Sequence, residues 1–186
     1  MIDLSPTRNA PANDVPPDPV AVFVGNLNGL TKSERKTLAG CLGRSLARAL
    51  EGGASPRVLR LFFTLLPSWT PRGPGRKTVR LAASQQFPAY FIVATLYGVV
   101  GSRGQGNLGQ SARTAPVASK RRRHLDAAML NLRGAALPTL PTRLATIVRL
   151  CPKMQIDFYP LTVDLLRWRE SGAPVTRRWL NDYLLK

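Results

Sequence analysis

Apolar residues recur at spacings of three and four from about residue 19 to the end of the chain, and this period constrains the fold most. The spacing matches the 3.6 residues of a helical turn, whereas alternating apolar and polar runs are too short to indicate strands. Glycines and prolines interrupt the pattern at intervals. The sequence therefore predicts an all-α fold: a compact bundle of about seven to eight helices with a flexible N-terminal leader and long basic loops.

The first group of segments ends near residue 100. Thr31 and Glu34 form a capping box, and Ser55 precedes a proline at a first helical position. The expected helices are residues 19–30, the stretch from Thr31 to the Gly52-Gly53 pair, residues 56–66, and a buried helix from Tyr90 to Val100 opened by Pro88. Residues 67–77 and 101–118, rich in glycine or proline, are expected to be loops.

Further helices are expected after residue 118. They begin at Ser119, near Pro141, at Asp157 with Pro160, and at the sequence Gly172-Ala-Pro174. Trp168, Trp179 and Tyr183 lie on apolar helix faces and are expected in the core. We therefore expect a flexible leader at residues 1–18, an N-terminal helical part with basic loops at 19–118, and a C-terminal helical bundle at 119–186, packed as one unit.

Cysteine and histidine are scarce, which argues against a structural metal site. Cys41, Cys151 and His124 are the only thiols and the only imidazole, and no zinc-ligand spacing occurs. The cysteines are interpreted as reduced, buried residues of a cytoplasmic protein, although a bridge between them stays open. The acidic, proline-rich N-terminus is unlike a signal peptide, and the apolar run from Phe87 to Val100 is too short to span a bilayer.

Charge is the strongest functional signal in the sequence. There are 27 Lys and Arg residues against 10 Asp and Glu, giving a formal net charge of +17. Residues 52–125 contain 12 of these cations and no acidic residue, so they supply most of the excess. A cationic surface of ordinary composition carries acids among its bases, and their absence here favours a polyanion partner, nucleic acid first. On charge alone, the candidate phosphate contacts are Arg72, Arg76, Lys77, Arg103, Arg113, Lys120, Arg121, Arg122 and Arg123.

Other patterns do not amount to an enzyme. Residues 104–109 match G-x-G-x-x-G, but without the strand that a dinucleotide site requires. His124 lacks the neighbours of a catalytic base, and Asp157 and Asp164 are expected to act as a helix cap or as salt-bridge partners of nearby arginines, namely Arg143, Arg149 or Arg167. Trp69 has two interpretations, stacking on an unpaired base or packing at its helix end. No cofactor, metal or catalytic residue is predicted.

Several short segments occur in the order found in one known family. They are CLGRSLARAL, LRLFFTLLPSW and AYFIVATLYGVV, then NLGQSAR at 107–113, SKRRRHLDAAML at 119–130, and IDFYPLTVDLLRW followed by VTRRWLNDYLL. On these segments the chain resembles the CasB family, the small subunit of the prokaryotic type I-E CRISPR surveillance complex, Cascade. The N-terminal leader, the 67–77 stretch and the glycine-rich GSRGQG depart from the family pattern.

The resemblance implies an all-helical, non-enzymatic protein that stabilises the R-loop and its displaced DNA strand. Its implied partners are CRISPR RNA, target DNA, the Cascade backbone subunits and large subunit, and a second copy of the chain. The positions that match the family's basic motifs are Arg44, Arg48, Arg113, Arg122, Arg123, Arg143, Arg177 and Arg178.

Two alternatives remain at this point. One is a free-standing RNA- or DNA-binding protein that coats its ligand without sequence preference, such as a ribosome-associated factor. The other is a helical protein of a membrane surface, which the placement of cations in loops disfavours, so no membrane partner is predicted.

Overall fold

The computed structural model describes residues 17–67, 76–101, 104–168 and 172–185, with the side chains of residues 76–85 excepted. Within these ranges the chain forms ten α-helices and one π-helical turn, and no strand. The all-α prediction is therefore confirmed, with more helices than expected. Their bounds are α1 (Pro19–Asn28), α2 (Lys32–Ala39), α3 (Leu46–Arg48), the π-helix η1 (Ala49–Gly53), α4 (Pro56–Leu65), α5 (Arg76–Val100), α6 (Leu108–Thr114), α7 (Ser119–Leu130), α8 (Leu140–Leu150), α9 (Phe158–Trp168) and α10 (Gly172–Leu184).

Helix α1 begins where the sequence predicted, at a carboxylate that serves two partners. The Asp18 side chain accepts the Val20 backbone N–H at 3.0 Å and the Tyr159 hydroxyl of α9 at 2.6 Å. These hydrogen bonds, the one from Tyr159 first, hold the pKa of Asp18 below its usual value. Phe23 and Leu27 are buried. Asp18 therefore both caps α1 and joins its start to α9.

The capping box of Thr31 and Glu34 is present, but the long helix predicted after it is wrong. Helix α2 ends at Ala39, a turn follows, and the chain becomes helical again only at Leu46. Gly43 lies in the turn with φ of +84°, a conformation that favours glycine, and a Cβ there would lie 3.2 Å from the Ala145 Cβ of α8. The break thus lets this segment approach α8 closely.

The prediction that Pro88 opens the buried helix is also wrong, because α5 starts at Arg76 and Pro88 lies inside it. A proline interrupts one backbone hydrogen bond of a helix. Every residue from Ala89 to Tyr97 is buried, so packing on all sides stabilises the helix beyond the proline. The segment at 68–75 lies outside the described residues, and with it Trp69.

Helix α6 lies within the stretch expected to be a loop, residues 101–118. The Asn107 side chain caps it by accepting the Gln110 backbone N–H at 3.2 Å. A Cβ at Gly109 would lie 2.0 Å from the Trp179 backbone oxygen, so only glycine fits this crossing with α10. The seven-residue α6 is too short to be stable alone, and its contact with α10 accounts for it.

The C-terminal helices follow the prediction. Trp168, Trp179 and Tyr183 are buried, and the two indole rings lie 5.3 Å apart. Cys41 and Cys151 are free and buried, and burial raises the pKa of both thiols. The prediction that both cysteines are buried core residues is confirmed, while their reduced state stays a prediction.

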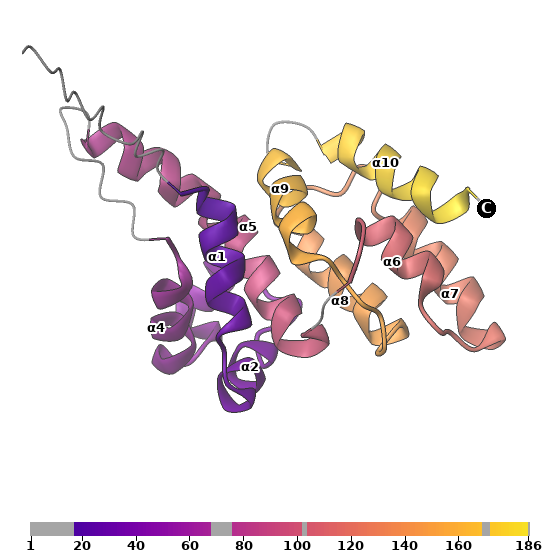
Figure 1. Ribbon diagram of the computed structural model, residues 1–186, viewed down its shortest axis with the longest axis horizontal. Coiled ribbons are helices and arrows are strands. Elements are labelled where there is room, and N and C mark those ends of the chain that lie inside the picture. Colours follow the sequence, from indigo (N-terminus) through magenta and orange to yellow (C-terminus); the bar gives the residue numbers. More distant parts are fainter. Residues whose placement is uncertain (1–16, 68–75, 102–103, 169–171, 186) are drawn as a thin grey trace, which may run out of the picture.

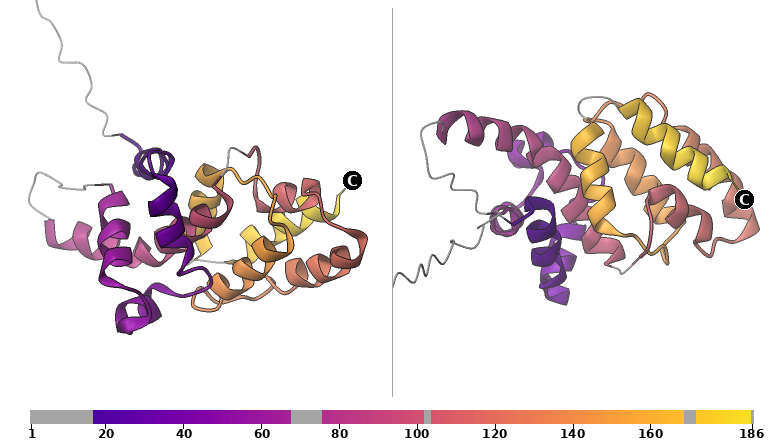
Figure 2. Two further views of the ribbon diagram at one scale, coloured as in Figure 1. Left: turned by 90° about the horizontal axis from the view of Figure 1, so that it is seen from below. Right: turned by 45° about the horizontal axis from the view of Figure 1, so that its top comes forward.

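Helix α5 connects the two groups of helices (Figures 1 and 2). It packs against α2 and α3 on one side and against α8 and α9 on the other, while α6 packs on α10 and α7 on α8. The division at residue 118 stays a prediction. None of the described helices is both long and apolar enough to cross a membrane.

Candidate nucleic-acid interface

The structure divides the predicted basic residues into three groups. The first group lies where no side chain is described. Arg72 and Arg103 lie outside the described residues, and Arg76 and Lys77 begin α5 instead of ending a loop.

The second group consists of arginines that the fold itself engages. Arg143 donates to the Asn131 carbonyl at the end of α7, and Arg113 donates to the Leu185 carbonyl just after α10. Arg122 donates to the carbonyls at the end of α6, and Arg178 forms an ion pair with Asp164. The helix C-terminus carries partial negative charge, so a guanidinium there is stabilising. Three arginines of a chain poor in acids thus find backbone carbonyls as their partners.

Asp164 has a different partner from those the sequence suggested. It is 2% exposed, accepts the Trp179 indole N–H at 2.6 Å and pairs with Arg178, which follows it on the next helix. The expectation of a salt bridge is confirmed, while the expected partners on α8 and α9 are wrong. Asp157 acts as the predicted cap, accepting the Tyr159 backbone N–H at 3.0 Å.

Arg122 lies among more partners than any other predicted contact residue. Its guanidinium is 3.5 Å from the Ala112 oxygen through Nη1 and 3.5 Å from the Ala115 oxygen through Nη2. It also lies near the Tyr183 hydroxyl, which donates to Asp126 Oδ1 at 2.5 Å. Burial, followed by the bond to Asp126, raises the pKa of Tyr183 to about 12, and Arg122 opposes that rise.

The third group is exposed, and its side chains make no hydrogen bond or ion pair with the described part of the chain. The group comprises Arg44, Arg48, Lys120, Arg121, Arg123 and Arg177. Three of the six lie among the first five residues of α7, before the exposed His124, whose Nδ1 lies 3.2 Å from the Lys120 carbonyl.

The first turn of α7 is open to an anion. Its N-cap residue, Ala118, offers no side-chain acceptor, and within the described ranges the backbone N–H groups of Ser119 and Lys120 have no partner. A helix N-terminus carries partial positive charge, so exposed cations there are unfavourable for the isolated protein. The helix dipole therefore disfavours the charges of Lys120, Arg121 and Arg123. A bound anion would offset this unfavourable interaction.

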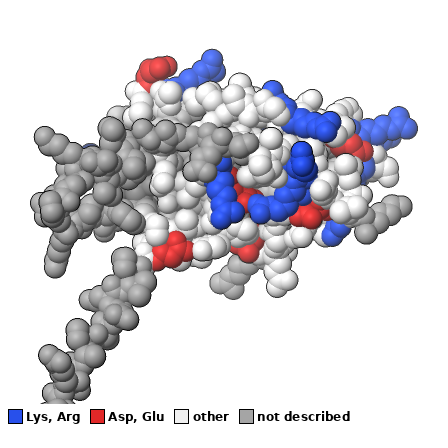
Figure 3. All heavy atoms as spheres, turned by 90° about the horizontal axis from the view of Figure 1, so that it is seen from above, with Lys and Arg blue, Asp and Glu red and all other residues white. Residues whose placement is uncertain are grey.

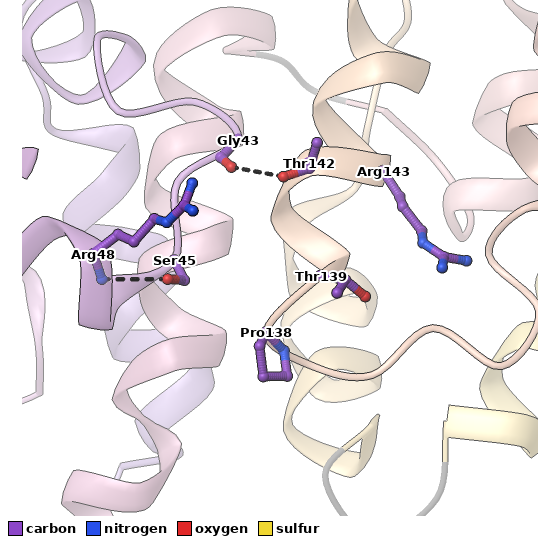
Figure 4. Close-up of a pocket in the computed structure, with 7 residues that line it drawn as sticks. All are labelled: Gly43, Ser45, Arg48, Pro138, Thr139, Thr142 and Arg143. Atoms are coloured by element: carbon purple, nitrogen blue, oxygen red, sulfur yellow. Dashed lines mark hydrogen bonds between the residues drawn. The ribbon is translucent and has the colours of Figure 1, made fainter.

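Arg48 lies at a groove between the first helices and α8 (Figure 4). The groove has a volume of about 480 Å³, and Thr142 closes one side by donating to the Gly43 carbonyl at 3.1 Å. Arg48 extends toward this groove, whereas the Arg143 guanidinium points away from it. Only Arg48 of the two thus offers a free charge here.

Acidic and basic residues mix on part of the surface. Viewed from above, Lys and Arg gather on the half of the molecule away from the undescribed residues, with Asp and Glu among them (Figure 3).

Among the described residues no group of three His, Cys, Asp or Glu could hold a metal ion. The G-x-G-x-x-G segment follows helix α5 instead of a strand, which removes the geometry of a dinucleotide loop.

The sequence did not predict which cations are engaged and which are free. The acceptors of Arg113 and Arg143 come from segments distant in the chain, so no local spacing indicates them. Arg35 was missed altogether, and its guanidinium lies 5.5 Å from the centre of the Tyr97 ring. The one available signal in the sequence was the position of an arginine in the acid-free segment 52–125. This signal does not separate the engaged arginines from the exposed, unpaired ones.

Fold and surface together define an all-helical protein in which Arg178 is the one cation of the described ranges that pairs with an acidic side chain. The family profile of CRISPR-associated protein Cse2 matches residues 42–184. The chain belongs to the Cse2 family, also called CasB, of CRISPR-associated proteins. The resemblance noted in the sequence is thereby confirmed.

A solved structure shares the fold. It is a CRISPR-associated protein of the Cse2 family from Thermus thermophilus, 24% identical, with a TM-score of 0.58 over 89% of this chain and 97% of that one. No curated protein sequence matches this chain significantly.

Proposed function

We propose that this protein is the non-catalytic small subunit of a type I-E Cascade complex and that its exposed cations hold the displaced DNA strand of the R-loop. Membership of the Cse2 family supports the place in the complex. The structure contributes the candidate contact residues, which are the exposed and unpaired cations.

The first turn of α7 carries the proposal. Lys120, Arg121 and Arg123 are exposed and unpaired there, at a helix end where positive charge lowers stability. Such an arrangement is costly for the protein alone and favourable once phosphate groups bind, since the helix N-terminus and the cations then attract the same anion. Phosphate is also the group that every nucleotide presents, so binding here is independent of sequence.

A modest number of such contacts is sufficient for the proposed role. Replacing a DNA duplex by an RNA–DNA duplex is nearly balanced in free energy, so additional contacts to backbone phosphates shift the equilibrium toward the open state. Arg44, Arg48 and Arg177 add exposed cations from other parts of the fold. We propose that they extend the path of the strand beyond α7.

Affinity purification of the tagged protein from its source cells tests the place in the complex. The expected result is a stoichiometric set of Cascade subunits with short RNAs of uniform length and repeated flanks. Heterogeneous RNA without a stoichiometric protein partner would overturn the proposal and leave a free-standing nucleic-acid-binding protein.

A further inference from the structure

Arg122 stands between two exposed arginines in the sequence, yet it is half-buried and faces the interior. We propose that Arg122 is a positioning residue: it joins α6, α7 and α10 and thereby holds the start of α7 with Lys120, Arg121 and Arg123 facing outward, without itself contacting nucleic acid. The inference rests on the proposed function, because positioning has meaning only if these three cations bind phosphate.

Helical spacing separates the side chains. Arg122 and Asp126 are four residues apart and share the inner face of α7 with the buried Leu125 and Met129. Arg121 and Arg123 are displaced by one residue each, about 100° around the helix axis, and both are exposed. One turn of helix thus presents the same residue type to two different environments.

Three segments meet at the Arg122 guanidinium. Its two terminal nitrogens lie 3.5 Å from the Ala112 and Ala115 oxygens at the end of α6. The same group lies near Tyr183 of α10 and lowers the pKa of its hydroxyl, which in turn donates to Asp126 on α7 itself. The carbonyls at the end of α6 supply partial negative charge, which compensates for the partial burial of the cation.

The planar shape of the guanidinium matters. A forked group reaches two carbonyls at once, whereas the ammonium of lysine is a point charge on a flexible stem. The inference therefore requires arginine at position 122, while a phosphate contact made by charge alone would accept lysine. The substitution Arg122→Lys separates the two roles.

The test compares Arg122→Ala, Arg122→Lys and Arg123→Ala in the full chain. Thermal unfolding gives stability, and fluorescence anisotropy with a labelled single-stranded DNA, well below the unfolding temperature, gives affinity at several salt concentrations. The variant Arg123→Ala is the matched control, because it removes the same charge from the same helical turn.

We expect Arg122→Ala to lower the unfolding temperature and to weaken binding by about threefold to tenfold. The weaker binding arises because one or more cationic side chains, no longer held in place, must be ordered when DNA binds. Its slope of log K against log salt should equal that of the wild type, because no phosphate contact is removed. Arg122→Lys should recover neither stability nor affinity fully. Arg123→Ala should keep or slightly raise its unfolding temperature while its slope falls by about 0.7.

An unchanged unfolding temperature with a reduced slope in Arg122→Ala, or full recovery by lysine, would overturn the inference. If Arg122→Ala fails to fold, the lysine variant and the control still decide it. If the wild-type chain shows no salt-dependent binding, the proposed function fails. In that case, an unfolding temperature that is lowest for Arg122→Ala would identify Arg122 as a purely structural residue and refute the positioning role.

Discussion

Removing the two exposed arginines near the start of α7, by Arg121→Ala with Arg123→Ala, should make the protein more stable while weakening its binding of nucleic acid. A charge at a helix terminus contributes about 0.3–1 kcal/mol, and both side chains here lie on the unfavourable end of the dipole. The double variant should therefore gain about 1 kcal/mol of unfolding free energy, or about 2–4 °C in unfolding temperature. Neither side chain makes a described contact whose loss would offset this gain.

Binding should change in the opposite direction. Each phosphate contact to a single strand contributes about 0.7 to the slope of log K against log salt, so two lost contacts should reduce the slope by about 1.4. Anisotropy titrations with a labelled single strand at several salt concentrations measure this slope, and differential scanning calorimetry measures the stability at low salt, where the dipole effect is least screened.

The control removes the same charge elsewhere, by Lys32→Ala with Lys36→Ala. These exposed lysines lie at the two ends of α2, so their interactions with its dipole oppose each other and stability should change little. The salt slope of this control should stay close to that of the wild type. A double arginine variant that loses stability, or that keeps the wild-type slope, would refute the reasoning.

Other parts of the structure yield predictions of their own. Asp164→Ala should cost about 3 kcal/mol in urea unfolding, because the buried Trp179 indole N–H loses its acceptor; a loss under about 1 kcal/mol would contradict this. Gly109→Ala should cost at least about 2 kcal/mol, since the added Cβ meets the α10 backbone, whereas Gly25→Ala, with open space around it, should gain about 0.5–1 kcal/mol; equal effects would refute the close packing. The pKa of Asp18 is lowered in the folded state, so the stability that its carboxylate contributes is present at pH values above its ordinary pKa of 3.8. This stability is lost as the pH falls through the pKa of the folded state. Asp18→Asn should therefore flatten the acid branch of a stability–pH curve, and an unchanged branch would contradict the assignment.

The sequence predicted the helices that have one apolar face and capping signals at their ends. The capping box at Thr31 and the apolar faces that include Leu144, Leu165 and Trp179 are examples. Helix α6 was missed because its stability comes from α10, which lies about 70 residues further along the chain. The turn at Gly43 was missed because the apolar period continues through it, and the reason for the break, the contact with α8, is a tertiary one.

The candidate site was predictable as a set of cations and not as an arrangement. Absence of acids in residues 52–125 indicated a polyanion partner, and that signal remains the basis of the proposal. It also counted Arg113 and Arg122, whose positive charges are directed at helix carbonyls. Carbonyl groups carry no mark in the sequence, because every residue has one, so only the structure separates capping arginines from free ones.

The most direct test of the central claim is R-loop formation by the assembled complex. Complexes carrying the wild-type subunit, the Arg121→Ala and Arg123→Ala variant, or the Lys32→Ala and Lys36→Ala control would be titrated onto matching target DNA. Permanganate reactivity of the displaced strand then reports the fraction of open DNA at each concentration, with subunit composition verified for all three. The account predicts that the arginine variant needs a higher concentration to open the DNA while the control matches the wild type. Equal opening by all three complexes would contradict it.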